Sequence, residues 1–118
     1  MLNRIQLDIH RQLGIPDDYA PGRRVPYFAD ARELVDVGPN LVGRMQRLTP
    51  RAASSWQRMQ SAARAEGVTL LIVSGFRSFD YQAELSRNKL GAGQLIDDIL
   101  KVSAAPGYSQ HHSGEAID

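Results

Sequence analysis

The chain has 118 residues, which is enough for one domain with a single core. Apolar residues make up 42% and charged residues 23%, the usual balance of a globular protein. Fourteen Lys and Arg stand against thirteen Asp and Glu, so the net charge of +1 gives no electrostatic support for nucleic-acid binding. The absence of cysteine excludes disulfides and thiolate metal sites, so any metal must be held by His, Asp, Glu or water.

The first 44 residues predict a helix followed by a loop. Apolar residues recur at helical spacing from Leu2 to Leu13, and Gly14 gives a stop signal. Residues 16–30 hold three prolines and a glycine, which predicts a loop with at most a short extended piece. Residues 33–38, E-L-V-D-V-G, predict a short strand before a Gly-Pro turn.

A capped helix and a buried strand are predicted next. Thr49 and Pro50 have the residue types of an N-cap and a first helical turn, and Gly67 is a C-terminal stop. The predicted apolar stripe of this helix consists of Ala52, Trp56, Met59 and Ala63. Residues 68–74, V-T-L-L-I-V-S, form a continuous apolar run that predicts a strand buried on both faces.

Two further helices and a loop complete the chain. We expect a helix from about Ser78 or Phe79 to Leu90 and another over 94–101, followed by a loop over 103–108. Asp97 and Asp98 lie in the second of these helices and are expected to be solvated. The predicted fold class is α+β, with a small antiparallel sheet flanked by helices.

The last eight residues contain a candidate pair of metal ligands. His111 and Asp118 are separated by seven positions, and an imidazole nitrogen and a carboxylate oxygen are both suitable for zinc. His112 competes with His111 for this role, because side chains of neighbouring residues in an extended segment point to opposite faces. Spacing alone leaves the choice open. His10 is expected on the polar, solvated side of the first helix.

A second candidate site follows the predicted buried strand. Residues 74–78, S-G-F-R-S, lead from the strand into a helix, where a rigid support presents functional side chains. Arg77 has the chemistry to bind a carboxylate or to stabilise a developing oxyanion. Gln82, one turn into the helix, has an amide suited to a peptide group.

Taken together, the two motifs resemble the VanY-type D-alanyl-D-alanine carboxypeptidases, zinc peptidases of the LAS type. Residues 74–82, S-G-F-R-S-F-D-Y-Q, match the family pattern S-G-Y-R-S-x3-Q except for Phe76 in place of Tyr. The family pattern S-x-H-x2-G-x-A-x-D is matched throughout within 108–118, Y-S-Q-H-H-S-G-E-A-I-D. The resemblance covers roughly residues 45–118 and implies the LAS-type zinc peptidase fold for that part, with 1–44 as an N-terminal extension.

The resemblance implies a role for each matching residue. His111 and Asp118 fall on zinc ligands, and Arg77 falls on the catalytic residue that stabilises the polarised carbonyl. The substrate-binding positions that the resemblance implies are Gln82, Ser109, Tyr108 and Ser78. The implied reaction is removal of the terminal D-alanine from a peptidoglycan stem peptide by metal-activated water.

One part of the family pattern has no counterpart in this sequence. Family members carry a later Glu-x-x-His or Glu-Pro-Trp-His segment, whose Glu is the general base and whose His is the third zinc ligand. We therefore expect the chain to be the N-terminal part of a longer enzyme. As written, it is expected to bind zinc weakly and to be almost inactive.

Alternatives to this activity remain open on sequence. An endolysin-type peptidoglycan endopeptidase has the same zinc motif, and an L,D-carboxypeptidase is a near neighbour. A non-catalytic peptidoglycan-binding module would keep the pocket but lack the third zinc ligand. The resemblance implies the periplasm or cell envelope. The N-terminus lacks the continuous apolar centre of a secretory signal, so the cytoplasm stays possible.

Overall fold

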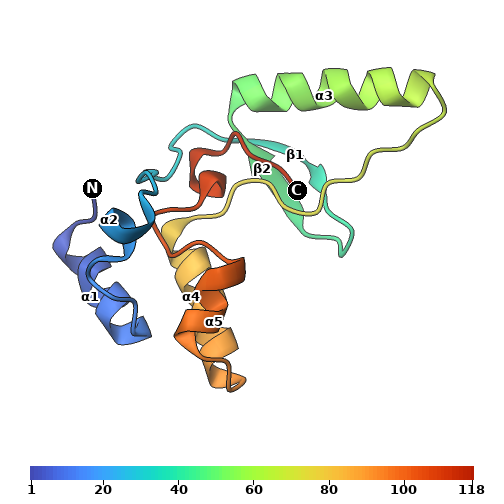
Figure 1. The fold of residues 1–118 in the computed structure, drawn as a ribbon. Helices are drawn as coiled ribbons and strands as arrows, with labels where there is room; N and C mark the ends of the chain where they lie inside the picture. The colour runs from blue at the N-terminus through green and yellow to red at the C-terminus, as the bar shows by residue number, and fades with distance from the viewer.

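The computed structural model describes all residues, 1–118, and contains six helical elements and one hairpin (Figure 1). In chain order the elements are α1 (Arg4–Leu13), α2 (Tyr19–Arg23), β1 (Val35–Pro39), β2 (Met45–Leu48), α3 (Pro50–Ala65), α4 (Phe79–Gly91), α5 (Ile96–Val102) and the 3-10 helix η1 (Gln110–Ser113). Helices α1, α2, α4 and α5 gather on one side, and α3 lies with the hairpin on the other. The terminal segment runs between the two groups.

The sheet is a single antiparallel hairpin, as the predicted α+β class requires. Val35 pairs with Leu48, and a bulge between Asp36 and Gly38 shifts the register toward the loop. Asn40 holds that loop, because its side-chain oxygen accepts backbone N–H bonds from Val42 and Arg44. Strand β1 confirms the strand expected at 33–38, whereas β2 was not foreseen.

Two hydrophobic clusters hold the molecule together. One cluster joins α1, α2, α4, α5 and the loop before η1 through the buried residues Leu13, Ile15, Tyr19, Ala83, Leu100 and Ala105. The other joins β2, α3 and the segment after α3 through Leu48, Ala53, Trp56 and Ile72. Residues 1–44 therefore contribute to both groups of elements, and a boundary at 44 passes through the hairpin. The division into an extension and a peptidase part stays a prediction.

Local signals placed the helix ends correctly. The Thr49 hydroxyl accepts the N–H of Ala52 at the start of α3, and the Ser78 hydroxyl accepts the N–H of Tyr81 at the start of α4. Gly14 ends α1 in the left-handed conformation that glycine adopts without a steric penalty. Helix α5 confirms the prediction for 94–101 within two residues.

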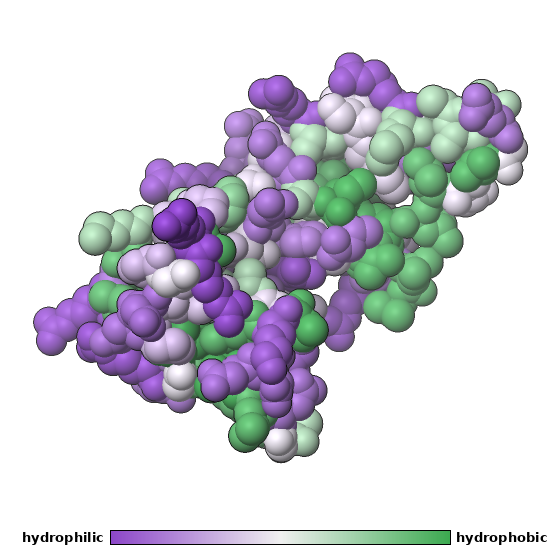
Figure 2. Space-filling model, in the orientation of Figure 1, coloured by the Kyte–Doolittle hydropathy of each residue, from purple (hydrophilic) through white to green (hydrophobic).

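The predicted buried strand at 68–74 is wrong. This segment is extended, but only Val73 and Ser74 have backbone partners in another segment, and both bond to Asp118. Leu71 is 63% exposed and Val73 is 51% exposed, while Ile72 is buried. Figure 2 shows the hydrophobic surface that gathers below α3 along this segment. A strand needs a neighbour along its length, and the apolar run alone does not supply one.

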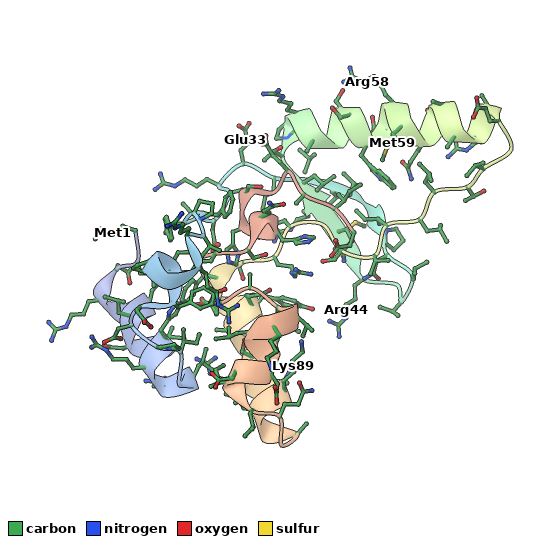
Figure 3. All side chains as sticks on the ribbon, in the orientation of Figure 1. Met1, Glu33, Arg44, Arg58, Met59 and Lys89 are labelled. Atoms are coloured by element: carbon green, nitrogen blue, oxygen red, sulfur yellow. The ribbon has the colours of Figure 1, made fainter.

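Two smaller expectations also need correction. Residues 16–30 contain the short helix α2, where Pro21 is tolerated because its missing N–H lies in the first, unpaired turn. Trp56 is buried as expected, but Met59 is 47% exposed. It projects from α3 on the side that faces the extended segment (Figure 3).

Asp97 and Asp98 are exposed, as predicted. No helix has the length and apolar character needed to span a membrane.

His10 is buried, and its predicted solvation is wrong. Its side chain stacks on Phe79 and meets the edge of Tyr108. Its Nε2 lies 2.7 Å from the carbonyl oxygen of Pro106, which only accepts, so Nε2 carries the proton and donates it. Burial lowers the pKa of His10, and the bond to Pro106 partly offsets this. The helical pattern of α1 does not indicate that His10 is buried, because the residues that cover His10 come from much later in the chain.

We predict that His10→Ala lowers the free energy of unfolding by about 1–3 kcal/mol at pH 7.5, because it leaves the Pro106 carbonyl unpaired. The pKa of His10 is lower in the folded state, so the unfolded chain binds the proton more readily. The contribution is fully present above pH ~6.5 and falls as the pH is lowered. Urea unfolding followed by circular dichroism should show a smaller difference between wild type and variant at pH 5.0 than at pH 7.5. A difference that grows at pH 5.0 would contradict this assignment.

Candidate metal and substrate site

The two sequence motifs lie side by side in the structure. The terminal segment runs against residues 74–77, and the red and yellow parts of the chain meet there in Figure 1. Asp118 donates its N–H to the Ser74 carbonyl and accepts the N–H groups of Val73 and Ser74. The Arg77 N–H donates to the carbonyl of His111. These backbone bonds bring together residues more than thirty positions apart in sequence.

His111 presents one ring nitrogen to Asp118. Its Nδ1 lies 2.7 Å from the carbonyl oxygen of Gly75, so Nδ1 is the protonated nitrogen and donates. In the neutral ring its Nε2 then carries the lone pair, and this atom lies 3.1 Å from Oδ2 of Asp118. Such a carbonyl bond fixes the tautomer and ring orientation that a metal-binding histidine needs.

His112 is fully buried and has no free nitrogen. Its Nδ1–H donates to the carbonyl of Arg77 at 2.7 Å, and its Nε2 accepts the N–H of Gly107 at 2.9 Å. Burial lowers the pKa of His112, which fits this neutral tautomer. The structure thus places His111, and not His112, beside Asp118. The segment is a 3-10 helix and not the extended segment that we expected. The two rings therefore point apart because of helical geometry and not because side chains alternate along a strand.

Arg77 lies beside the same carboxylate. Its Nη1 donates to the Ser74 hydroxyl at 3.1 Å and is 3.8 Å from Oδ2 of Asp118. Burial lowers the pKa of Arg77, and the Asp118 charge counters the effect. Its Nε is buried and has no partner. The guanidinium is therefore held in place while retaining a free donor.

A cavity of about 570 Å³ lies next to these groups, between α4, α5 and the terminal segment. Gln82, Ser109 and Tyr108 line it together with Arg77, His111 and Asp118. Gln82 donates through Nε2 to the carbonyl of Ala104, while its Oε1 is buried without a partner. The Ser109 oxygen accepts the N–H of His111, so its hydroxyl proton remains free to donate. Burial raises the pKa of Tyr108.

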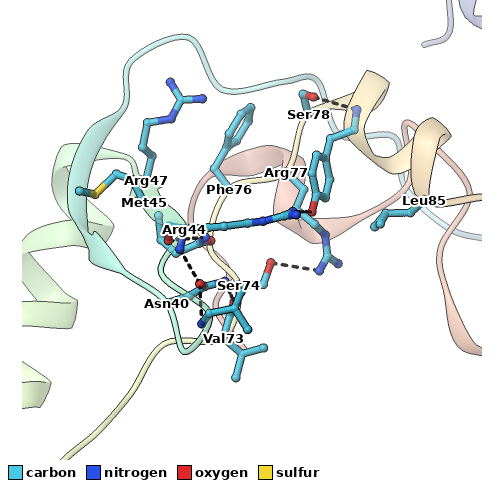
Figure 4. Close-up of a pocket in the computed structure, with 13 residues that line it drawn as sticks. Asn40, Arg44, Met45, Arg47, Val73, Ser74, Phe76, Arg77, Ser78 and Leu85 are labelled. Atoms are coloured by element: carbon cyan, nitrogen blue, oxygen red, sulfur yellow. Dashed lines mark hydrogen bonds between the residues drawn. The ribbon is translucent and has the colours of Figure 1, made fainter. Parts of the chain in front are cut away.

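Ser78 lies apart from the other predicted substrate-binding residues. Its hydroxyl caps α4, and it lines a second cavity of about 450 Å³ between the hairpin and the start of α4 (Figure 4). Arg77 and Leu85 line both cavities and form the wall between them.

Sequence reasoning missed two contributors to the site. Gly75 supplies the carbonyl that orients His111, and Lys89 lines the first cavity with its Nζ bonded to the Ser103 hydroxyl. Lys89 is seven residues after Gln82, so the two occupy one face of α4. That spacing was visible in the sequence, whereas the Gly75 contact was not.

The donors present fit part of a zinc site. In the neutral imidazole, Nε2 of His111 and Oδ2 of Asp118 face each other as two electron-pair donors, an arrangement that suits a cation between them. Zinc bonds of about 2.0–2.2 Å in tetrahedral geometry place two ligand atoms about 3.3 Å apart, close to the separation seen. No cluster of three or more metal-ligating side chains exists in the structure, so this pair is two ligands and not a complete site.

Comparison with known proteins defines the class to which this fold and site belong. Residues 45–118 match the family model "VanY: D-alanyl-D-alanine carboxypeptidase", and the chain belongs to that family. One relative is "Putative carboxypeptidase YodJ" of Bacillus subtilis (strain 168). It is 29% identical to this chain over 113 residues, which are 93% of this chain and 38% of YodJ.

Two solved structures share the fold. The LD-carboxypeptidase LdcB superposes with a TM-score of 0.66 at 31% identity, covering 79% of this chain and 45% of LdcB. A mutant of the vancomycin-resistance D,D-pentapeptidase VanY, in complex with Zn(II), superposes with a TM-score of 0.55 at 28% identity. That match covers 80% of this chain and 54% of VanY. The chain therefore has the LAS-type peptidase fold and spans about half or less of each relative.

We predict that Gly75→Ala destabilises the site and the fold together. A Cβ at this position would lie 2.7 Å from the carbonyl oxygen of Arg47 in β2, so the backbone that orients His111 must move. The expected loss is about 1–3 kcal/mol in the free energy of unfolding. Gly91→Ala, at the end of α4 with open space around it, is the matched control and should be neutral or slightly stabilising. Equal effects of the two substitutions in urea unfolding would refute the close-contact explanation.

Proposed function

We propose that this chain provides zinc-binding and substrate-binding residues of a D-alanyl-D-alanine carboxypeptidase acting on peptidoglycan stem peptides. The observation that carries the proposal is the meeting of His111 and Asp118, 3.1 Å apart, at a cavity that also contains Arg77 and Gln82. Membership of the VanY family supports the reaction class. The Zn(II) in complex with the solved VanY mutant supports the choice of metal.

His111 and Asp118 hold zinc in this proposal. The Gly75 carbonyl keeps the proton on Nδ1 and leaves Nε2 for the metal. Bound zinc supplies Lewis-acid polarisation of the scissile carbonyl and a water of lowered pKa. A third ligand and a general base are needed in addition to these residues, because the structure brings only two donors together.

Arg77 stabilises negative charge on the reacting carbonyl. Its guanidinium is half-buried, held by Ser74, and adjacent to the carboxylate of Asp118. A fixed cation in a partly desolvated position favours a developing oxyanion more than it favours the neutral carbonyl of the substrate. This difference is what lowers the barrier.

Gln82, Ser109 and Tyr108 bind the carboxy-terminal D-alanine unit. The unpartnered Oε1 of Gln82 is suited to accept a peptide N–H, and an empty acceptor of this kind is costly to bury without a ligand. The free Ser109 hydroxyl proton is suited to donate to a carboxylate. Tyr108 forms part of the cavity wall. A peptidoglycan substrate places the protein in the periplasm or cell envelope.

A second candidate is an L,D-carboxypeptidase, which removes the D-alanine that follows an L-centre in a tetrapeptide. The similarity to LdcB, with the higher TM-score of the two solved structures, favours it. The two activities share the roles given to His111, Asp118 and Arg77. They differ in the stereochemistry of the residue before the scissile bond.

The deciding experiment measures D-alanine release by the native protein from a pentapeptide ending in D-Ala–D-Ala and from the corresponding tetrapeptide, with zinc and with EDTA. We expect release from the pentapeptide and its loss in EDTA. Release only from the tetrapeptide would replace the first candidate with the second. Peptide binding that persists in EDTA, with no release of D-alanine in zinc, would show a binding module.

Arg77→Ala is predicted to lower kcat/KM for D-alanine release by about 10²–10³-fold, since a lost oxyanion contact costs about 2.7–4 kcal/mol in the transition state. The thermal unfolding midpoint should stay close to that of wild type, because Arg77 makes one hydrogen bond through its side chain. Arg87→Ala, on the exposed side of α4 in an ion pair with Glu84, is the control and should keep full activity. Activity of Arg77→Ala within a few-fold of wild type would rule out the role.

A further inference from the structure

The second cavity, between the hairpin and α4, is strongly cationic. Three of its thirteen lining residues are arginines, namely Arg44, Arg47 and Arg77, and none is acidic. Asp118 lies near Arg77, but no carboxylate lies within ion-pair distance of Arg44 or Arg47. Clustered guanidinium groups without acidic partners attract anions, and each guanidinium is shaped to hold a carboxylate with two parallel hydrogen bonds.

The arginines are held by contacts that leave donors free. Arg44 reaches from the hairpin loop toward α4, where its Nη1 donates to the hydroxyl of Tyr81 at 3.3 Å (Figure 4). Arg47 lies over the ring of Phe76 at 5.5 Å. Each contact restrains the arginine and uses at most one of its five N–H groups. The remaining donors of Arg44 are available to a ligand in the cavity.

The position of this cavity relative to the proposed metal pair determines what it would hold. Arg77 and Leu85 separate it from the cavity that contains Gln82 and Ser109. A peptide whose scissile carbonyl lies at Arg77, with its D-alanine unit beside Gln82, must continue on the other side of Arg77. The acyl half of the substrate then enters the cavity lined by Arg44 and Arg47.

We propose that Arg44 is a specificity-determining residue that binds a carboxylate in the acyl half of the substrate. This inference rests on the proposed function and extends it, because it names an acidic residue upstream of the scissile bond as the preferred substrate class. Arg47 adds positive potential, and the bond to Tyr81 positions Arg44. Phe76, which stands where the family pattern has Tyr, forms part of the same wall.

The test uses three pairs of peptides ending in D-Ala–D-Ala. Within each pair, glutamate is replaced by glutamine at the first, second or third residue before the D-Ala–D-Ala unit. Because the native protein with zinc is expected to cleave such peptides, dissociation constants are measured by isothermal titration calorimetry on analogues in which a non-hydrolysable bond replaces the scissile amide. We expect the wild type to prefer the glutamate peptide of at least one pair by about two- to fivefold, the range for exposed charge pairs. Higher salt should reduce the preference.

Three variants assign the preference to a residue. Arg44→Gln should bind both peptides of that pair equally, Arg44→Lys should retain part of the preference, and the control Arg87→Gln should retain all of it. Arg44 and Arg87 are both exposed, so none of these changes is expected to affect folding. Circular dichroism spectra should accordingly match that of the wild type.

The outcomes separate this inference from the proposal on which it rests. Equal binding of glutamate and glutamine peptides by the wild type, or a preference unchanged in Arg44→Gln, would overturn the role of Arg44 and leave the carboxypeptidase proposal intact. No binding of any of the peptides by the wild type would overturn both.

Discussion

The site depends on the alignment of the terminal segment with residues 74–77. Four backbone hydrogen bonds, from Val73, Ser74, Arg77 and Asp118, join the two segments. Side-chain bonds from both histidines add to them, each ring donating to a carbonyl of the other motif. Both side chains depend on this alignment, because the Gly75 carbonyl orients His111 and the backbone of Val73 and Ser74 holds Asp118. Catalytic groups need such rigid positioning more than they need strength in any one contact.

The two adjacent histidines have different roles: His112 is structural, and His111 is the candidate ligand. His112 is buried, with both nitrogens bonded to backbone groups, and it connects the loop at Gly107 to the extended segment at Arg77. His111 uses one nitrogen in the same manner and leaves the other free. An imidazole suits both purposes because it has one donor and one acceptor in its neutral form. Replacing His111 would remove the proposed metal ligand, whereas replacing His112 would remove a buried structural contact of the same turn.

Local chemistry in the sequence predicted the helices well. Thr49, Ser78 and Gly14 act through neighbours a few residues away, and their roles as caps follow from residue type and spacing. Contacts between residues far apart in sequence could not be predicted in the same way. The apolar run 68–74 has the composition of a buried strand but lacks a paired neighbour over most of its length. His10 has a polar residue type on a helix and is buried because Pro106 and Phe79 pack over it.

The candidate site was predictable only where two motifs were taken as one pattern. His111 and Asp118 alone are a weak signal, and their match to a family motif is what indicates them as ligands from sequence. The family motif also selected His111 over His112. The physical reason for that choice lies in the Gly75 carbonyl and the Gly107 N–H, which no spacing rule identifies. The arginines of the hairpin cavity were not singled out, because Arg44 and Arg47 lie more than 25 residues before Arg77 and resemble ordinary surface charges.

A zinc titration of wild type and His111→Ala by isothermal titration calorimetry at pH 7.5 tests directly whether His111 and Asp118 hold the metal. Because Nε2 of His111 and the Asp118 carboxylate are the only metal donors that the structure brings together here, we expect one zinc per wild-type chain and at least tenfold weaker binding by the variant. Circular dichroism should show both proteins folded. Unchanged zinc affinity in a folded His111→Ala protein would contradict the placement of the metal between these two residues.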